Sequence, residues 1–190
     1  MIIEDGKGSG VKAQVDSNNR LLTSAVTLTQ QIDSNTEGDA YNINTGNLTF
    51  SAAGTFLYVK NNEDRDLMIE TIIVGLGTGT FSDSAEINIV RNPTGGDLIS
   101  DATAVADFEN RNFGSNRTLS ADAYSGKSSG TLTGGDNFAL IYATGSSRAV
   151  IPTYILLPKG TSIGITFDPK LSSGNVKAYC ATIAYLVESA

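Results

Sequence analysis

The chain contains no histidine and no tryptophan, and it has a single cysteine among 190 residues. Without histidine it lacks the commonest general base, the usual serine and cysteine triads, and the ligand of most zinc sites. The lone Cys180 excludes an intrachain disulfide. Because Cys180 lies in the apolar run 179–184, we expect a buried structural thiol rather than a nucleophile. The sequence therefore has few means to catalyse a reaction, and we expect no enzyme activity.

Charged residues are also scarce, at 17% of the chain, and the net charge is −7. A phosphate backbone would be repelled, and no cluster of lysine and arginine offsets this, so we expect no nucleic-acid partner. No apolar run approaches the roughly 20 residues that a membrane span needs. Met1 to Ile3 lead into Glu4 and Asp5 rather than into a basic segment and an apolar run. We therefore expect no signal peptide and synthesis in a reducing cytoplasm.

The chain is instead rich in glycine, serine, threonine and asparagine, which favours strands joined by many turns. Apolar residues alternate with polar ones in several short runs, as they do in half-buried strands. The clearest runs are 56–59, 67–74, 86–89, 138–142, 154–157, 163–167 and 176–187. The last is the longest and is expected to be central. Turn signals recur at short intervals, so the sequence predicts an all-β, jelly-roll-like sandwich.

Two regions depart from this pattern. Residues 92–135 carry few apolar side chains, which indicates long loops or short edge strands. Residues 1–45 have little aromatic content, and we interpret them as an extended N-terminal arm and linker in front of a body formed by 46–190. A strand pair around Asp16–Asn19 or a short helix near 24–32 is the alternative for the arm.

The stretch DSNTEGD places Asp33, Asn35 and Glu37 at alternate positions before Gly38, as in the first half of a calcium loop. Position 12 of such a loop should be a bidentate glutamate, but it is Asn44 here. The flanking sequence also lacks two amphipathic helices. We therefore expect a polar turn, with no metal and no cofactor.

Pairs of carboxylates could serve a glycosidase. The candidates are Glu63 with Asp64 and Asp66, Asp83 with Glu86, and Asp107 with Glu109. All lie among polar neighbours, so solvated turns or strand faces are the preferred interpretation.

Two segments resemble parts of known virion proteins. NPTGGDLISDATAVADFENRNFGSNRTLSADAYSGKSSGTLTGG (92–135) resembles a segment of structural proteins of tailed bacteriophages. YILLPKGTSIGITFDPKLSSGNVKAYCATIAYLVE (154–188) resembles the closing strands of β-sandwich virion proteins, in which a Pro-x-Gly turn precedes an alternating strand. The resemblance implies a jelly-roll body, self-association as a homotrimer, and attachment to a capsid or tail.

Together these observations favour a capsid decoration or cement protein, located on the virion surface and bound to the major capsid protein. The arm would cross capsid subunits and tie them together. Its expected contact residues are Lys7, Lys12, Arg20, Leu21 and Leu22. The alternative is a carbohydrate-binding sandwich of a head or tail fibre, with Tyr124 as the expected sugar contact.

Overall fold

The computed structural model describes residues 14–15, 21–22, 29–100 and 106–187. The described chain is almost entirely β-structure, which confirms the predicted all-β class. The strands are β1 (Gln14–Val15), β2 (Leu21–Leu22), β3 (Ala40–Asn44), β4 (Leu48–Phe50), β5 (Gly54–Asn61), β6 (Asp66–Leu76), β7 (Thr80–Phe81), β8 (Ala85–Arg91), β9 (Gly95–Gly96), β10 (Asp107–Asn110), β11 (Ala121–Ser125), β12 (Leu132–Thr133), β13 (Asp136–Ala143), β14 (Arg148–Leu157), β15 (Ser162–Asp168), β16 (Leu171–Ser173) and β17 (Val176–Val187); the helices are α1 (Gln30–Glu37) and α2 (Asp97–Ser100).

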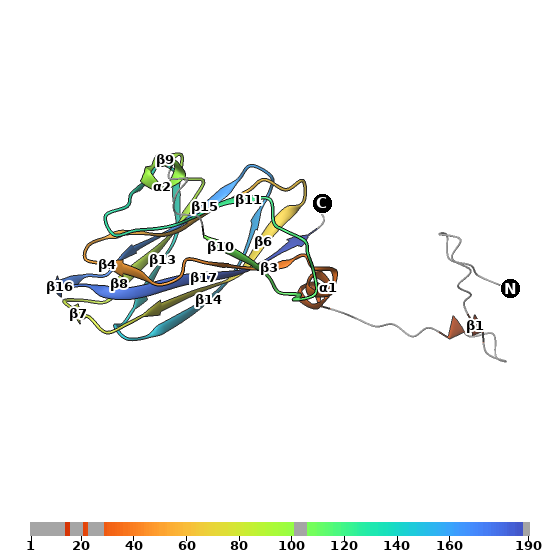
Figure 1. The fold of residues 1–190 in the computed structure, drawn as a ribbon, viewed down its shortest axis with the longest axis horizontal. Coiled ribbons are helices and arrows are strands. Elements are labelled where there is room, and N and C mark those ends of the chain that lie inside the picture. Colours follow the sequence, from red (N-terminus) through yellow and green to blue (C-terminus); the bar gives the residue numbers. More distant parts are fainter. Residues whose placement is uncertain (1–13, 16–20, 23–28, 101–105, 188–190) are drawn as a thin grey trace.

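Two antiparallel sheets form a sandwich (Figure 1). Sheet 1 has the order β10-β3-β17-β6-β14, with β4 also paired to β17, and sheet 2 has the order β11-β5-β15-β8-β13. β17 is the longest strand and lies in the middle of sheet 1, as the sequence predicts. One side of the sandwich therefore carries the edge strands β10 and β11, and the other side carries β13 and β14.

Successive long strands alternate between the sheets. β3 belongs to sheet 1, β5 to sheet 2, β6 to sheet 1 and β8 to sheet 2; β13 stays in sheet 2, β14 returns to sheet 1, β15 lies in sheet 2 and β17 in sheet 1. The first and last of these strands, β3 and β17, are neighbours in sheet 1. Most pairings consequently join segments that are distant in the sequence.

The core lies between the sheets and is built from the inward residues of alternating strands. In β15, Ile163, Ile165 and Phe167 are buried, as their spacing predicts. The Phe167 ring stacks on Phe56 at 4.5 Å between centroids and meets the edge of Phe50 at 5.0 Å. Each buried aromatic side chain removes about 150–250 Å² from water, so this trio contributes a large part of the hydrophobic stabilisation.

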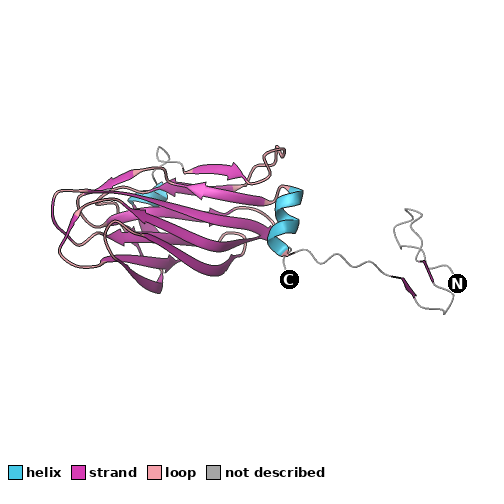
Figure 2. Cartoon of the chain, turned by 90° about the horizontal axis from the view of Figure 1, so that it is seen from below, coloured by secondary structure: helices cyan, strands magenta, loops and turns pink. Residues whose placement is uncertain are grey.

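Helix α1 lies at one end of the strands (Figure 2). Thr29 caps its N-terminus, where the Thr29 side chain accepts a hydrogen bond from the Ile32 amide, and Gly38 caps its C-terminus in the left-handed conformation (φ 78°). The Ser34 hydroxyl donates to the Leu186 carbonyl and attaches the helix to the end of β17. Residues 33–37 are thus helical, and the expected polar turn there is wrong: Thr29 and Gly38 supply both ends of a short helix.

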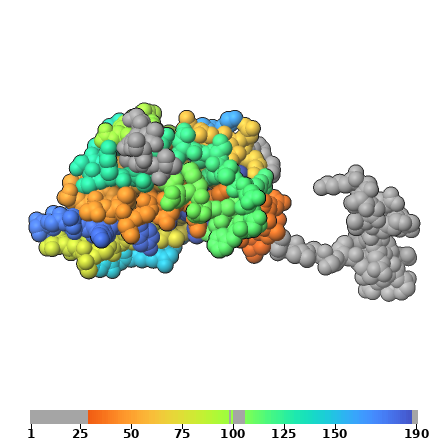
Figure 3. Space-filling view, viewed as in Figure 1, coloured from red at the N-terminus to blue at the C-terminus, as the bar shows by residue number. Residues whose placement is uncertain are grey.

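The described parts of the region 92–135, namely 92–100 and 106–135, form short strands and turns, as expected, together with one short helix. The segment that begins at residue 106 runs over the surface beside α1 (green in Figure 3) and supplies the edge strands β10 and β11. The small pair β9–β12 and the helix α2 complete this region. Residues 107–110 form the strand β10, in agreement with the expected short edge strands.

The boundary expected after residue 45 lies too late in the chain. β3 pairs with β10 and β17, and its residues Ala40, Tyr41 and Ile43 are buried in the core. The body therefore includes residues 40–44, because this strand joins two others in sheet 1. Within the expected arm, β1 and β2 form an antiparallel pair with Gln14 opposite Leu22, which matches the strand-pair alternative.

Candidate functional site

Large exposed apolar side chains gather on the two edge strands β13 and β14. Of the eight such side chains found in the described chain, six lie on these strands: Phe138, Leu140, Tyr142, Val150, Tyr154 and Leu156. We call this set the β13–β14 edge. Exposed apolar side chains concentrated on two strands in this way mark an interaction site more often than a free surface.

Strand geometry explains why these side chains face outward. In β14, Leu157 is buried and pairs with Leu67, so its neighbour Leu156 must point to the opposite face. In β13, the buried Ala143 likewise leaves Tyr142 on the outside. The sequence predicted that 138, 140 and 142 share a face, and the structure shows that this face is the exposed one.

Both edge strands are irregular. The register of β13 against β8 shifts between Asn137 and Ala139, and that of β14 against β6 shifts between Pro152 and Ile155. Tyr154 has a positive φ of 49° in this second bulge. The Thr153 hydroxyl donates to the Ile69 carbonyl at 2.8 Å, which satisfies an acceptor of the interrupted ladder. Bulges and a proline hinder the addition of a further strand, which favours a partner that binds through side chains.

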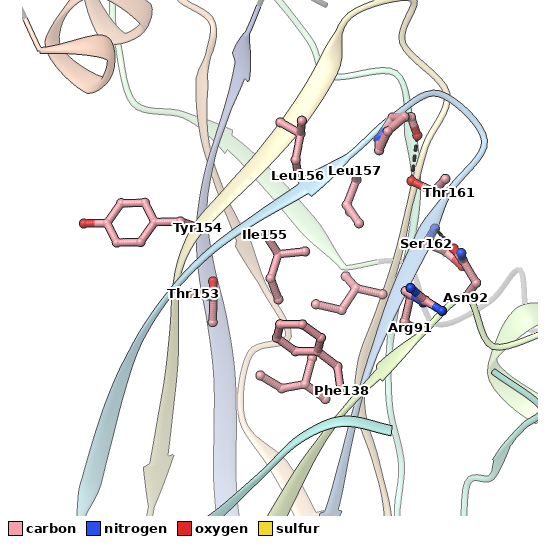
Figure 4. Close-up of a pocket in the computed structure, with 13 residues that line it drawn as sticks. Arg91, Asn92, Phe138, Thr153, Tyr154, Ile155, Leu156, Leu157, Thr161 and Ser162 are labelled. Atoms are coloured by element: carbon pink, nitrogen blue, oxygen red, sulfur yellow. Dashed lines mark hydrogen bonds between the residues drawn. The ribbon is translucent and has the colours of Figure 1, made fainter. Parts of the chain in front are cut away.

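A cavity of about 380 Å³ opens between the two sheets at this edge (Figure 4). Its apolar lining includes Ile89, Phe138, Ile155, Leu156, Leu157, Pro158 and Ile163. In the figure the Phe138 ring lies among these side chains near Ile155, whereas the Tyr154 ring points away from them.

Polar groups at the cavity are already engaged within the chain. The Asn92 side-chain oxygen accepts from the Ser162 amide at 2.8 Å, and the Thr161 hydroxyl donates to the Pro158 carbonyl at 2.7 Å. Arg91 is paired with Asp136 at 2.6 Å. The part of the lining that is not used in hydrogen bonds is therefore mainly apolar. It suits a hydrophobic side chain or ring better than a charged ligand.

A second exposed feature is the connection between β10 and β11. Phe113 at its tip is 99% exposed. Hydrogen bonds hold the turn beneath it: the Asn112 side-chain oxygen accepts from the Gly114 amide at 3.1 Å, and the Asn112 side-chain amide donates to the Thr36 carbonyl at 3.0 Å. Asn110 donates to the carbonyls of Gly38 and Arg117. The turn is well supported, although its aromatic tip contacts water.

Asp39 fastens this turn to the body. Its carboxylate is only 2% exposed; Oδ2 accepts from Arg65 Nη1 at 2.8 Å, and Oδ1 lies 2.8 Å from Arg117 Nη1 in an ion pair that lacks hydrogen-bond alignment. Arg117 also donates to the Glu37 carbonyl. The same carboxylate raises the pKa of Tyr41, as a smaller effect than the burial of the phenol. Three distant segments thus meet at one buried charge.

The residues predicted to contact a capsid are only partly described. Lys7, Lys12 and Arg20 lie outside the described residues. Leu21 and Leu22 form β2 and pair with β1. Their role in binding stays a prediction.

The predicted sugar contact Tyr124 lies on β11. Its ring stacks on Tyr58 with centroids 6.0 Å apart and planes at 18°. Since Tyr58 is buried, one face of the Tyr124 ring is already used for packing within the chain. This ring is therefore a poorer sugar platform than the sequence indicated.

The possible calcium ligands Asp33, Asn35 and Glu37 all lie on α1. Residues two apart on a helix point in different directions, so these oxygens do not converge as the loop pattern requires. Within the described ranges, no three acidic, histidine or cysteine side chains form a group that could hold a metal ion.

The carboxylates considered for a glycosidase include several with structural partners. Glu63 accepts from the Ser120 amide at 2.6 Å, Asp64 pairs with Lys159, and Glu86 lies 3.3 Å from Lys170. The Lys159 hydrogen bond lowers the pKa of Asp64. These contacts join loops and strands, so Glu63, Asp64 and Glu86 each have a structural partner.

Cys180 is fully buried in β17, as expected, and burial raises the pKa of its thiol. A protonated, inaccessible thiol is neither a nucleophile nor a metal ligand.

No family model matches the chain, and no curated protein is similar to it. Of the helices in the described residues, none has both the length and the apolar character needed to cross a bilayer. Sequence reasoning missed Phe113, whose signal was a lone aromatic residue between Asn112 and Gly114 in an otherwise polar stretch. It also missed the cavity, because Arg91, Phe138 and Thr161 come from three separate segments.

Proposed function

We propose that the chain is a structural protein of a tailed-phage virion, a capsid decoration or cement protein that forms a trimer and binds the capsid surface. The observation that carries this proposal is the β13–β14 edge, where six large apolar side chains are exposed on the edge strands of the two sheets. Burying such side chains against another subunit is favourable by about 25 cal/mol per Å² before the costs of association.

The strand order supports a jelly-roll architecture for the body. Four strands in the order β3-β17-β6-β14 face four in the order β5-β15-β8-β13, and successive strands lie in different sheets except for β8 and β13. Two interleaved Greek keys in a double sheet have this character, and capsid proteins are among the proteins that use it. The fold alone does not define a function, so the apolar edge carries more weight.

We further propose that residues 1–28 bind the capsid, with Lys7, Lys12 and Arg20 near acidic groups of the major capsid protein. Three arms on one trimer would strengthen a weak single contact through avidity. Truncation should end before Thr29, because its side chain caps α1.

The experiment measures the solution mass of the full chain by light scattering and its co-sedimentation with particles of the phage that encodes it. We expect a mass three times the 19.9 kDa of one chain, and binding that disappears when residues 1–28 are removed. A full-length variant with Lys7, Lys12 and Arg20 changed to glutamate is the matched control for the charges. A monomer over the whole concentration range, or undiminished binding by the truncated chain, would refute the corresponding part of the proposal.

The exposed rings of Tyr142 and Tyr154 favour a second candidate, a glycan-binding fibre protein. Sugar rings stack on such aromatic faces, and both tyrosines lie on the β13–β14 edge. A glycan array tests this candidate: binding that is lost in Tyr142→Ala or Tyr154→Ala would favour it, and an array without signal at high protein concentration would exclude the sugars it carries.

A further inference from the structure

Phe113 combines an exposed side chain with a backbone that is held in place. Its ring is fully exposed, yet the turn that carries it is fixed by the hydrogen bonds of Asn110 and Asn112 and by the ion pair of Arg117 with Asp39. Ordering a loop before binding lowers the entropic cost of association, and buried aromatic residues are the commonest binding hot spots. A rigid turn with an aromatic tip therefore suggests a receiving pocket on a partner.

The chain itself carries a suitable pocket on its other side. The turn joins β10 to β11, whereas the cavity lies between β13 and β14, the opposite edges of the two sheets. A dry apolar cavity of about 150 Å³ is large enough to hold benzene. The cavity here, at about 380 Å³, has room for the phenyl ring of Phe113.

The two features also lie at the same level along the strands. The Arg111 amide donates to the Ala40 carbonyl; Ala40 is opposite Tyr185, Tyr185 is opposite Met68, and Met68 is opposite Leu156, which lines the cavity. One row of residues across sheet 1 thus connects the base of the Phe113 turn to the rim of the cavity.

From this arrangement we propose that Phe113 of one copy inserts into the cavity beside Leu156 of the next copy. This inference rests on the self-association proposed above and specifies its contact. The interface is heterologous, since each copy offers its turn on one side and its cavity on the other. Because both features lie at one level, the operation that relates neighbours has little rise along the strands, and with the threefold rotation of the proposed trimer it closes a ring.

The apolar area fits the centre of a specific contact. On one copy the fully exposed aromatic side chain offers about 150–250 Å², and on the next copy the six partly exposed side chains of the β13–β14 edge offer roughly 500 Å². A standard interface buries about 800 Å² on each partner, of which the centre is the most apolar part. The Phe113 turn and the β13–β14 edge thus supply the apolar centre of such an interface.

The test uses two full-length variants that each damage one half of the contact. Phe113→Ala removes the anchor and leaves the cavity, whereas Leu156→Arg blocks the cavity and leaves the anchor. Ile32→Ala, at an exposed apolar side chain on α1, is the matched control. Masses are measured by light scattering for each protein and for an equimolar mixture of the two variants, and circular dichroism confirms that all are folded.

We expect the wild type and Ile32→Ala to be trimers and each single variant to dissociate with a constant raised at least thirtyfold. The mixture should form a heterodimer, because one intact anchor meets one intact cavity. A trimeric Phe113→Ala protein overturns this inference and leaves the proposed self-association standing. A monomeric wild type overturns both, and an open filament of wild-type protein overturns the ring.

Discussion

The buried carboxylate of Asp39 gives the sharpest stability prediction. It lies between Arg65 and Arg117, and its own backbone joins α1 to β17: the Asp39 amide donates to the Ser34 carbonyl, and its carbonyl accepts from the Leu186 amide. The substitution Asp39→Asn keeps the shape of the side chain and the backbone contacts. It removes the charge that both guanidinium groups face.

The expected magnitude follows from the exposure of the partners. Removing one member of a fully buried ion pair costs about 3–5 kcal/mol, because the remaining charge stays buried. Arg65 and Arg117 are 27% and 53% exposed, so water solvates part of the charge that is left. We therefore expect Asp39→Asn to lower the free energy of unfolding by about 2–3 kcal/mol, a fall in Tm of roughly 5–10 °C for a chain of this size.

Urea unfolding followed by far-UV circular dichroism measures this difference, since the chain has no tryptophan for fluorescence. The Phe113→Ala background avoids the concentration dependence that an oligomer would introduce. Asp64→Asn is the control, because Asp64 pairs with Lys159 in solvent and its loss should leave the midpoint unchanged. A loss below about 0.5 kcal/mol for Asp39→Asn, with an unchanged slope, would refute the argument that the ion pairs stabilise the fold.

Three further predictions concern the core and the turns. Phe167→Ala should cost about 3–5 kcal/mol, measured by the same unfolding assay, because the ring packs on Phe50 and Phe56. Gly126→Ala should lower the melting temperature, because an added Cβ would lie 1.5 Å from the Thr55 carbonyl oxygen, whereas Gly114→Ala meets no contact closer than 3.5 Å and should be neutral. Stability should fall as pH rises from about 8 to 10, because burial raises the pKa of the Cys180 thiol and the unfolded chain loses that proton first; Cys180→Ala should flatten this part of the pH profile.

The central strands could be predicted because period and burial agree there. In β15, the face that carries Ile163, Ile165 and Phe167 must be the one that meets the core, since the intervening residues are small or polar. In β17, a long run of small and apolar residues fits a strand that is covered on both sides by neighbours in its sheet. Local pattern and tertiary position therefore point to the same structure.

The burial of the edge strands could not be predicted from the sequence in the same way. Alternation in β13 puts Phe138, Leu140 and Tyr142 on one face of the strand and their neighbours on the other. It does not determine which of the two faces meets the core. The answer depends on the place of β13 at the edge of sheet 2, which is set by long-range pairing with β8. The same limit applies to Asp39, whose partners at 65 and 117 are brought to it only by the folded topology.

The helix at 30–37 is a different case, because its signals were present in the sequence. Thr29 just before the first helical residue and Gly38 just after the last are standard cap residues. The alternate acidic and amide residues suggested a loop because they match the spacing of metal ligands. Cap residues define the backbone conformation directly, whereas ligand spacing has a meaning only once the loop conformation is given, so the caps are the stronger predictor here.

The edge strands β13 and β14 hinder pairing with a further strand and still expose a surface for association. An edge strand exposes unpaired backbone groups, and the bulges of β13 and the Pro152 bulge of β14 make these groups unsuitable for pairing with another strand. The same strands nevertheless expose apolar side chains, which favours association through side chains alone. Such contacts have a defined geometry, because a ring must enter a cavity, whereas strand pairing tolerates many registers. An anchor on β10–β11 and a cavity at β13–β14 would therefore allow copies to assemble while strand addition remains blocked.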